Sequence, residues 1–255
     1  MKLRRLAATA VAWLAVSYVV GDISLRGQDC GEDCVPESEC SIPPCPGGYV
    51  DNGAGCCCST HSPIVIDVDG QGFLLTNLVD GVNFDINDRF YLNRVSWIQQ
   101  TSTNAWLALD RDGDGTIDDA SELFGNLTPQ PPPPPGMARN GFLALAVFDQ
   151  PLYGGNGDGI IDARDAVFSR LRLWQDLNHD GISQPEELKT LPEMGVAAIS
   201  LQYTESRRTD QYGNVFRYLG EFYRTDGSTS RGIVDVLLLV GRRISTAAEP
   251  TAAQP

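Results

Sequence analysis

Five aspartates crowd into one short stretch of the chain, 110-DRDGDGTIDDASELFG-125, and four of them have a regular spacing. Asp110, Asp112 and Asp114 alternate with other residues, and Asp118 follows one turn later. Like charges at this spacing repel one another, so a partner of opposite charge should neutralise them. Calcium is a hard cation that takes about six to eight oxygen ligands, several of them from carboxylates. The stretch therefore predicts a calcium-binding loop.

The spacing of these residues is that of an EF-hand-type loop. Such a loop places side-chain ligands at its first, third, fifth, ninth and twelfth positions, a carbonyl at the seventh and glycine at the sixth. Ser121 occupies the twelfth position here, so we expect a loop one residue longer that is closed by Glu122. The alternative is a solvated acidic turn. The predicted ligands of this 110–122 loop are Asp110, Asp112, Asp114, the Thr116 carbonyl, Asp118 and Glu122.

A second stretch, 176-DLNHDGISQPEEL-188, matches the same spacing more closely. Ser183 replaces the usual apolar residue at the eighth position. His179 lies at the fourth position, where side chains point outward, so we interpret it as a bystander. The predicted ligands of this 176–187 loop are Asp176, Asn178, Asp180, the Ile182 carbonyl and Glu187.

A third loop is interrupted by an insert, 150-QPLYGG-155. Gly154 would take the first position by count, but Asp149, displaced by the insert, is the natural first ligand. The predicted ligands of this 149–165 loop are Asp149, Asn156, Asp158, the Ile160 carbonyl, Asp162 and Asp165.

A fourth loop, 67-DVDGQGF-73, keeps only part of the pattern. Asp67 and Asp69 are its candidate ligands, whereas Gln71 replaces the third acid. Calcium is preferred over Mg²⁺ for all of these loops because its larger shell suits many carboxylates. Transition metals are not expected, because the loops contain no thiol ligands and their one imidazole is the outward-pointing His179.

The chain has 255 residues and divides by composition. Residues 1–21 read as a signal peptide or an N-terminal anchor, with basic residues before an apolar run that is shorter than the roughly 20 residues of a membrane span. All seven cysteines lie within 22–60, which predicts a disulfide-linked stalk. The calcium-binding module is expected at 61–244, with a polyproline loop insert at 128–136 and a disordered tail at 245–255.

The elements that must position these loops read as an α+β fold. Short apolar runs predict antiparallel strands, and Gly213-Asn214 and Asp226-Gly227 predict hairpin turns. Helical spacing predicts short helices at 140–148, capped by Asn140, at 163–171 and from Pro185. We therefore expect short strands, hairpins and a few short helices built around EF-hand-type loops.

With these loops identified, residues from about 62 to 240 resemble a known bacterial family. The phrases PIVIDVDGQGF, WLALDRDGDGTIDDASELFG, NGFLALAVFD and NGDGIIDARDAVFSRLRLWQDLNHDGISQPEELKTL look like the calcium-binding module of exported RTX/hemolysin-type proteins, related to the self-processing modules of iron-regulated RTX proteins. In self-processing members, calcium promotes cleavage of an Asp-Pro bond by the aspartate carboxylate. The corresponding dipeptide here is Ser62-Pro63, so the resemblance implies that this reaction is lost.

These observations favour an exported, calcium-stabilised structural or interaction module over an enzyme. Its net charge of −14 argues against a nucleic-acid partner, and a membrane contact is expected only through an uncleaved N-terminal segment. A calcium-dependent self-processing module is the alternative. The predicted location is secreted, periplasmic or at the cell surface, and an unidentified extracellular protein partner stays open.

Overall fold

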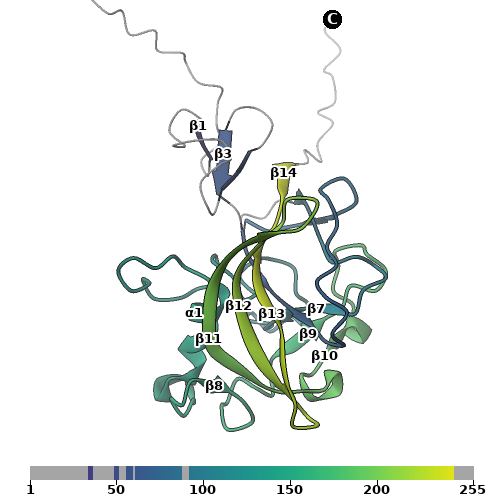
Figure 1. The fold of residues 1–255 in the computed structure, drawn as a ribbon. Coiled ribbons are helices and arrows are strands. Elements are labelled where there is room, and N and C mark those ends of the chain that lie inside the picture. The colour runs from purple at the N-terminus through teal and green to yellow at the C-terminus, as the bar shows by residue number, and fades with distance from the viewer. Residues whose placement is uncertain (1–33, 37–48, 52–55, 60, 88–91, 244–255) are drawn as a thin grey trace, which may run out of the picture.

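The computed structural model describes residues 34–36, 49–51, 56–59, 61–87 and 92–243 (Figure 1). Its strands are β1 (Cys34–Pro36), β2 (Tyr49–Asp51), β3 (Cys56–Ser59), β4 (Ile64–Asp67), β5 (Val82–Phe84), β6 (Asn93–Val95), β7 (Asn104–Ala108), β8 (Ile160–Ile161), β9 (Arg172–Trp174), β10 (Leu188–Lys189), β11 (Val196–Thr209), β12 (Val215–Arg224), β13 (Thr229–Leu237) and β14 (Val240–Arg243). Its helices are α1 (Gly141–Ala146) and the 3₁₀ turns η1 (Val147–Asp149), η2 (Pro151–Tyr153), η3 (Pro185–Glu187) and η4 (Pro192–Met194).

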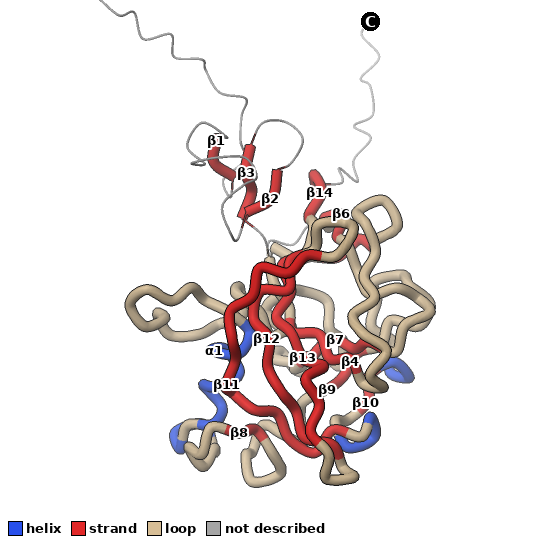
Figure 2. Tube along the Cα trace, viewed as in Figure 1, coloured by secondary structure: helices blue, strands red, loops and turns tan. Residues whose placement is uncertain are grey.

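One antiparallel sheet organises the described part of the chain. Its eight strands run in the order β10-β9-β7-β4-β13-β12-β11-β8. The three long strands β11, β12 and β13 curl together, so the sheet forms a half-barrel (Figures 1 and 2). Its central strand β4 pairs with β13 on one side and with β7 on the other, so distant segments of the chain meet there.

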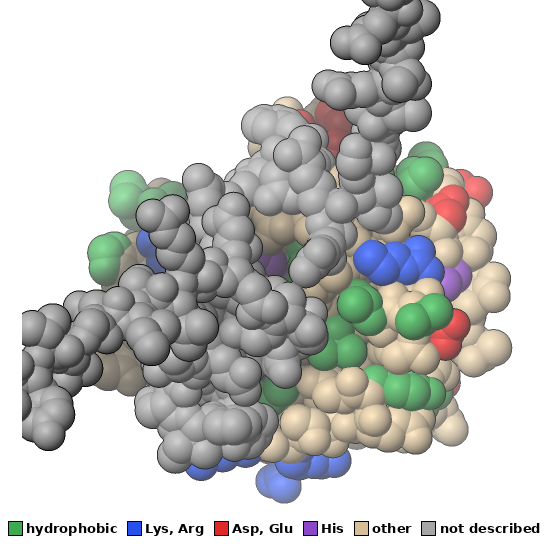
Figure 3. Space-filling model, turned by 90° about the horizontal axis from the view of Figure 1, so that it is seen from above, with side chains coloured by type: hydrophobic (Ala, Val, Ile, Leu, Met, Phe, Trp, Pro, Cys, Tyr) green, Lys and Arg blue, Asp and Glu red, His purple; other side chains and the backbone are tan. Residues whose placement is uncertain are grey.

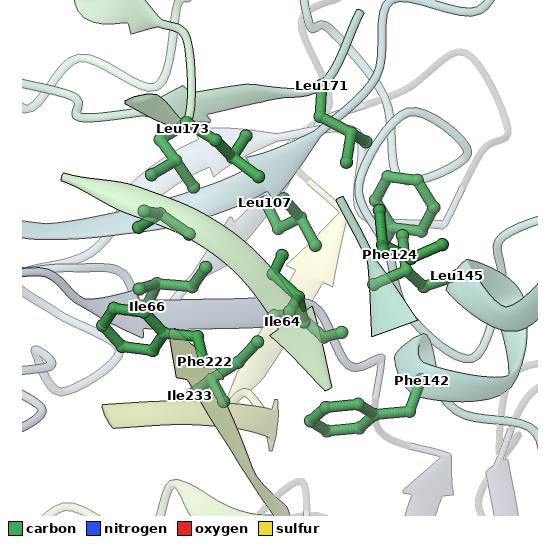
Figure 4. Close-up of a cluster of buried hydrophobic side chains, with 14 of the residues drawn as sticks. Ile64, Ile66, Leu107, Phe124, Phe142, Leu145, Leu171, Leu173, Phe222 and Ile233 are labelled. Atoms are coloured by element: carbon green, nitrogen blue, oxygen red, sulfur yellow. The ribbon is translucent and has the colours of Figure 1, made fainter. Parts of the chain in front are cut away.

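Both faces of this sheet are buried at its central strands β4 and β7. Successive side chains of a strand point to opposite faces, so neighbours in β4 enter different cores. Ile64 and Ile66 join one cluster, which α1 covers with Phe142 and Leu145 (Figure 4). Val65 joins the other cluster. Each of the four β4 residues is buried, which explains why its first three, 64–66, are apolar without alternation.

The second cluster lies between the main sheet and a smaller one. That smaller sheet has the strand order β14-β6-β5. Trp97 is the centre of the cluster, with its ring 4.8 Å from that of Trp106 and 5.4 Å from that of Trp174. Large aromatic side chains of this kind dominate the energy of a core, so this cluster fixes the segments that carry them.

The expected α+β class, with a few short helices built around EF-hand-type loops, was wrong. The structure is 36% strand and 10% helical, and α1 is its one α-helix among the described residues. The 110–122 loop follows strand β7 and the 176–187 loop follows β9, so neither begins from a helix. Strand ends replace the helix pair because the residues before each loop are buried on both faces of the sheet.

The individual helix predictions had mixed outcomes. The helix at 140–148 is confirmed as α1, with the Asn140 side chain accepting the Leu143 N–H at 2.9 Å. Residues 163–171 form turns instead: the Asp162 side chain takes the Arg164 N–H at 2.8 Å, and the backbone bond from the Phe168 N–H to the Asp165 carbonyl spans three residues and not four. The helix expected from Pro185 is only η3, since β10 begins directly after it and pairs with β9.

Two hairpins join the long strands, as the turn signals predicted. Gly213 and Gly227 both lie in hairpin turns with positive φ angles, 99° and 84°, which glycine adopts at low cost. β11 pairs with β12 along its length but with β8 only at Ile199 and Ser200. Its register with β12 shifts between Glu205 and Arg208, where the strand is exposed.

The prediction of disulfide bonds was also wrong, as far as the described residues extend. β1, β3 and β2 form a separate three-stranded sheet in which Cys34 lies opposite Cys58, yet no cysteine pair there is at disulfide distance. Backbone pairing joins these strands, with β3 between β1 and β2. Cys30, Cys40 and Cys45 lie outside the described residues, as do the predicted N-terminal segment and the C-terminal tail.

The surface of the described residues is mixed in character. Seen from above in Figure 3, hydrophobic, acidic and basic side chains lie next to one another. Residues 128–136 run as a loop without regular structure, and most of the prolines in it are exposed. No helix among the described residues is long and apolar enough to cross a membrane.

Candidate metal centre

The 110–122 loop gathers three carboxylates. Oxygen atoms of Asp110, Asp112 and Glu122 all lie within 4.8 Å of one another. Calcium binds oxygens at 2.3–2.6 Å, so oxygens that share one ion lie no more than about 5 Å apart. The donor set is all-oxygen and acidic, so these residues fit calcium in both spacing and chemistry.

Both ends of this loop are fixed by its own backbone. Asp110 accepts the N–H groups of Gly113 at 2.6 Å and Gly115 at 3.0 Å. Glu122 accepts the N–H groups of Arg111 at 2.9 Å and Asp118 at 3.0 Å. The carboxylate that closes the loop is therefore that of Glu122, the residue after the usual twelfth position.

The 176–187 loop repeats this arrangement. Asp176 accepts the N–H groups of Asp180 at 3.1 Å and Gly181 at 2.9 Å. Glu187 accepts the N–H group of Leu177 at 2.7 Å, which corresponds to Arg111 in the first loop. It also accepts the N–H group of Gln184 at 3.3 Å. The last carboxylates of both loops therefore accept from the second and ninth backbone positions, and the first carboxylates share the glycine N–H at the sixth.

The 149–165 loop reaches the same arrangement despite its insert. Asp149 accepts the N–H groups of Gly157 at 3.0 Å and Gly159 at 2.9 Å. Asp165 closes the loop by accepting the N–H groups of Asn156 at 3.1 Å and Asp162 at 2.8 Å. Asp149, and not Gly154, therefore occupies the first position.

The inner positions of the three loops are also equivalent. In each loop the side chain at the third position accepts the N–H of the fifth residue, and the acid at the fifth accepts the N–H of the seventh. The first set of bonds joins Asp112 to Asp114 (3.1 Å), Asn156 to Asp158 (3.0 Å) and Asn178 to Asp180 (3.1 Å). The second joins Asp114 to Thr116 (2.8 Å), Asp158 to Ile160 (3.0 Å) and Asp180 to Ile182 (2.8 Å).

The 67–73 loop has the first half of this pattern only. Asp67 accepts the N–H group of Gly72 at 2.7 Å, and Asp69 accepts that of Gln71 at 3.2 Å. An asparagine holds the end of the loop. Asn104 accepts the N–H group of Leu74 at 2.7 Å and donates to the Gly72 carbonyl at 3.0 Å. A neutral amide at this end brings no charge to a cation.

Several candidate ligands are buried, and in Glu122 and Asp176 the burial raises the pKa of the carboxyl group. Burial raises the pKa of Glu122 to about 7, against which the N–H groups of Arg111 and Asp118 act. Burial also raises the pKa of Asp176, and the N–H groups of Gly181 and Asp180 oppose that rise. A carboxylate that has lost water without gaining a counter-ion is unfavourable, so a bound cation would stabilise both groups.

Two tryptophans contact the 176–187 loop, which sequence reasoning missed. The Trp97 indole N–H donates to Asp176 at 2.9 Å, and the Trp174 indole N–H donates to Glu187 at 3.2 Å. Trp97 is 79 residues from Asp176, so local spacing carries no signal of this contact. The aromatic cluster therefore positions the first and last carboxylates of this loop.

Sequence reasoning also missed a guanidinium inside the 149–165 loop. Arg164 pairs with Asp158 and with Asp162, each at 2.6 Å. The hydrogen bond from Arg164 lowers the pKa of Asp162. Its position in the sequence, next to acids of the same loop, could have indicated an ion pair. This side chain already neutralises two of the predicted ligands.

Arg164→Gln is therefore expected to strengthen calcium binding at the 149–165 loop several-fold, because the ion no longer competes with the guanidinium. Calorimetric titration of the purified chain measures the affinity of this site. Arg231→Gln is the control, since Arg231 pairs with Glu221 on the sheet surface. An unchanged calcium affinity would mean that breaking the ion pairs between Arg164 and the two acids costs no free energy.

Comparison with known proteins assigns the chain to a family. The model of the SPM domain family matches residues 64–239, and the chain belongs to this family. The matched segment holds all four loops and the main sheet.

The chain is also similar to the iron-regulated protein FrpA of Neisseria meningitidis serogroup C, with 36% identity over 180 residues. The alignment covers 70% of this chain and 15% of FrpA, so the chain spans only a small part of that protein's length. The predicted link to iron-regulated proteins is confirmed at this level, whereas its EF-hand part is wrong.

Proposed function

We propose that this chain is an exported calcium-binding module with a structural or interaction role. The observation that carries the proposal is the cluster of Asp110, Asp112 and Glu122, whose oxygens lie within 4.8 Å of one another. The hydrogen-bond pattern of that loop recurs in the 176–187 loop and in the 149–165 loop, which makes an accidental acidic turn a poor explanation. Calcium is the only cofactor that we propose, and any further partner is an extracellular protein.

Calcium would act on this fold by relieving repulsion. Each of the three loops gathers several carboxylates that repel one another; among the described residues, Arg164 offsets this repulsion at Asp158 and Asp162, and Arg111 offsets it at Glu122. An ion that binds only the folded chain stabilises it by about 1.4 kcal/mol per site at tenfold above its Kd. Extracellular modules bind calcium with a Kd on the order of 10⁻⁴–10⁻³ M, so we propose that the module folds fully after export.

Calorimetric titration of the purified chain with calcium, paired with melting curves in calcium and in chelator, tests the proposal. We expect two or three bound ions and a higher melting temperature in calcium, because the 176–187 and 149–165 loops repeat the hydrogen-bond pattern of the loop that holds the Asp110, Asp112 and Glu122 cluster. Mg²⁺ at the same concentration is the control for ionic strength. Absence of both heat and a melting shift would refute the calcium function.

A calcium-dependent self-processing activity is the second candidate. The Ser62-Pro63 bond is held inside the fold: the Ser62 N–H donates to Asn126 at 2.8 Å, and the Pro63 carbonyl accepts the Val236 N–H at 3.0 Å. Serine has a hydroxyl where self-cleavage needs a carboxylate, which favours a module that is not an enzyme. New fragments that end at this bond after the titration would favour the second candidate.

A further inference from the structure

The 110–122 and 176–187 loops touch at equivalent positions. The Ile117 backbone N–H donates to the Ser183 hydroxyl oxygen at 2.6 Å, across 66 residues of sequence. Ile117 is fully buried and Ser183 is 4% exposed. Counted from Asp110 and Asp176, each of the two is the eighth residue of its loop. The serine that departs from the usual apolar residue therefore makes the contact between the loops.

This contact lies between the two closing carboxylates. The residue after Ile117 is Asp118, whose N–H donates to Glu122. The residue after Ser183 is Gln184, whose N–H donates to Glu187. One short path of backbone and hydrogen bonds thus joins the last ligand of one loop to the last ligand of the other. A shift of either carboxylate on ion binding moves the backbone at that contact.

We propose that Ser183 is a positioning residue that couples the two loops, so that calcium in one raises the calcium affinity of the other. This inference rests on the proposed calcium function. The first ion orders its own loop and, through the Ile117–Ser183 bond, part of the second loop. The second ion then has less ordering to do, which is positive coupling. Coupling of this kind changes affinities by a factor of about 5 to 150.

The fluorescence of two tryptophans in the chain can measure this coupling. The indoles of Trp97 and Trp174 donate to Asp176 and Glu187, so tryptophan fluorescence should follow calcium at the 176–187 loop. Asp110→Asn disables the other loop without touching either tryptophan. Asp176→Asn serves to assign the signal, because it should abolish the fluorescence change. The calcium Kd from this signal is then compared among the chain, Asp110→Asn, Ser183→Ala and the double variant.

We expect Asp110→Asn to weaken calcium binding at the 176–187 loop by at least about fivefold when Ser183 is present. In the Ser183→Ala background the same substitution should change that affinity less than about twofold. Ser183→Thr keeps the hydroxyl and should restore the larger effect. If Ser183 merely satisfied the buried Ile117 N–H, Ser183→Ala would lower the stability of the chain in chelator. It would leave the effect of Asp110→Asn on calcium affinity unchanged.

Two other results would overturn the coupling. One is an unchanged affinity in Asp110→Asn itself, a comparison that needs no change at Ser183 and so holds even if Ser183→Ala does not fold. The other is that Asp110→Asn weakens calcium binding at the 176–187 loop equally in the presence and in the absence of Ser183. In both results the unsubstituted chain still binds calcium. Absence of any calcium-dependent signal or heat in that chain would refute the calcium function itself.

Discussion

Asp176→Asn is expected to lower the melting temperature in calcium by roughly 5–10 °C and to leave it unchanged or higher in chelator. In calcium, the lost site removes about 2.7 kcal/mol when calcium is 100-fold above Kd, and about 1 kcal/mol shifts the melting temperature of a domain this size by 2–4 °C. In chelator, Asp176 is a buried carboxylate with a raised pKa, so a neutral amide of the same shape removes an unfavourable charge.

Melting curves in calcium and in chelator check whether the substitution lowers the melting temperature only in calcium. Asp226→Asn is the matched control, since Asp226 is exposed in the turn between β12 and β13 and lies outside the four loops. Its melting temperature should follow that of the unsubstituted chain in calcium and in chelator. Equal destabilisation of Asp176→Asn in both conditions would show that Asp176 supports the fold through the Trp97 bond and not through an ion.

Asp235→Asn is expected to stabilise the chain at pH 8 by up to about 3 kcal/mol and to have little effect at pH 4. Asp235 is fully buried, and burial raises its pKa to about 6, partly offset by the Gly141 N–H and the Ser62 hydroxyl. A raised pKa in the folded state means that the stability is present below the unfolded value of 3.8 and is lost as the pH rises through about 6.

Denaturant unfolding in chelator, from pH 4 to pH 8, measures this prediction free of calcium. The free energy of unfolding of Asp235→Asn minus that of the unsubstituted chain should grow across the range and level off above pH 7. Asp226→Asn should show no such growth, because the pKa of Asp226 is lowered by its bonds to Ser228. A difference that stays flat would mean that Asp235 keeps its proton or its charge throughout.

The loops were predictable because their bonds are local. The contacts of Asp110 with Gly113 and Gly115 span only a few residues, so spacing alone indicates them. The same reasoning placed Glu122 at the end of its loop and Asp149 at the start of another. Each of these contacts depends on turn geometry that a short segment determines by itself.

The surroundings of the loops were not predictable, because they depend on strand order. Trp97 reaches Asp176, and Ser183 reaches Ile117, only because the sheets bring distant segments together. The sequence of each segment does not indicate which distant segment it contacts. The EF-hand assignment failed for a related reason: loop spacing says nothing about whether a helix or a strand leads into the loop. The turns at 163–171 have helical spacing, but a side chain competes for their backbone.

The long strand β11 has a consequence for self-association. Past Leu201, whose N–H donates to the Gly159 carbonyl at 3.0 Å, the outer edge is not paired by β8, and an open edge is a template on which a second chain can add a strand. The exposed part of that edge carries Glu205, Arg207 and Arg208, and the register irregularity between Glu205 and Arg208 interrupts its flat surface. Charge and bulge both oppose stacking, so concentrated solutions of this chain should resist fibre formation from that edge.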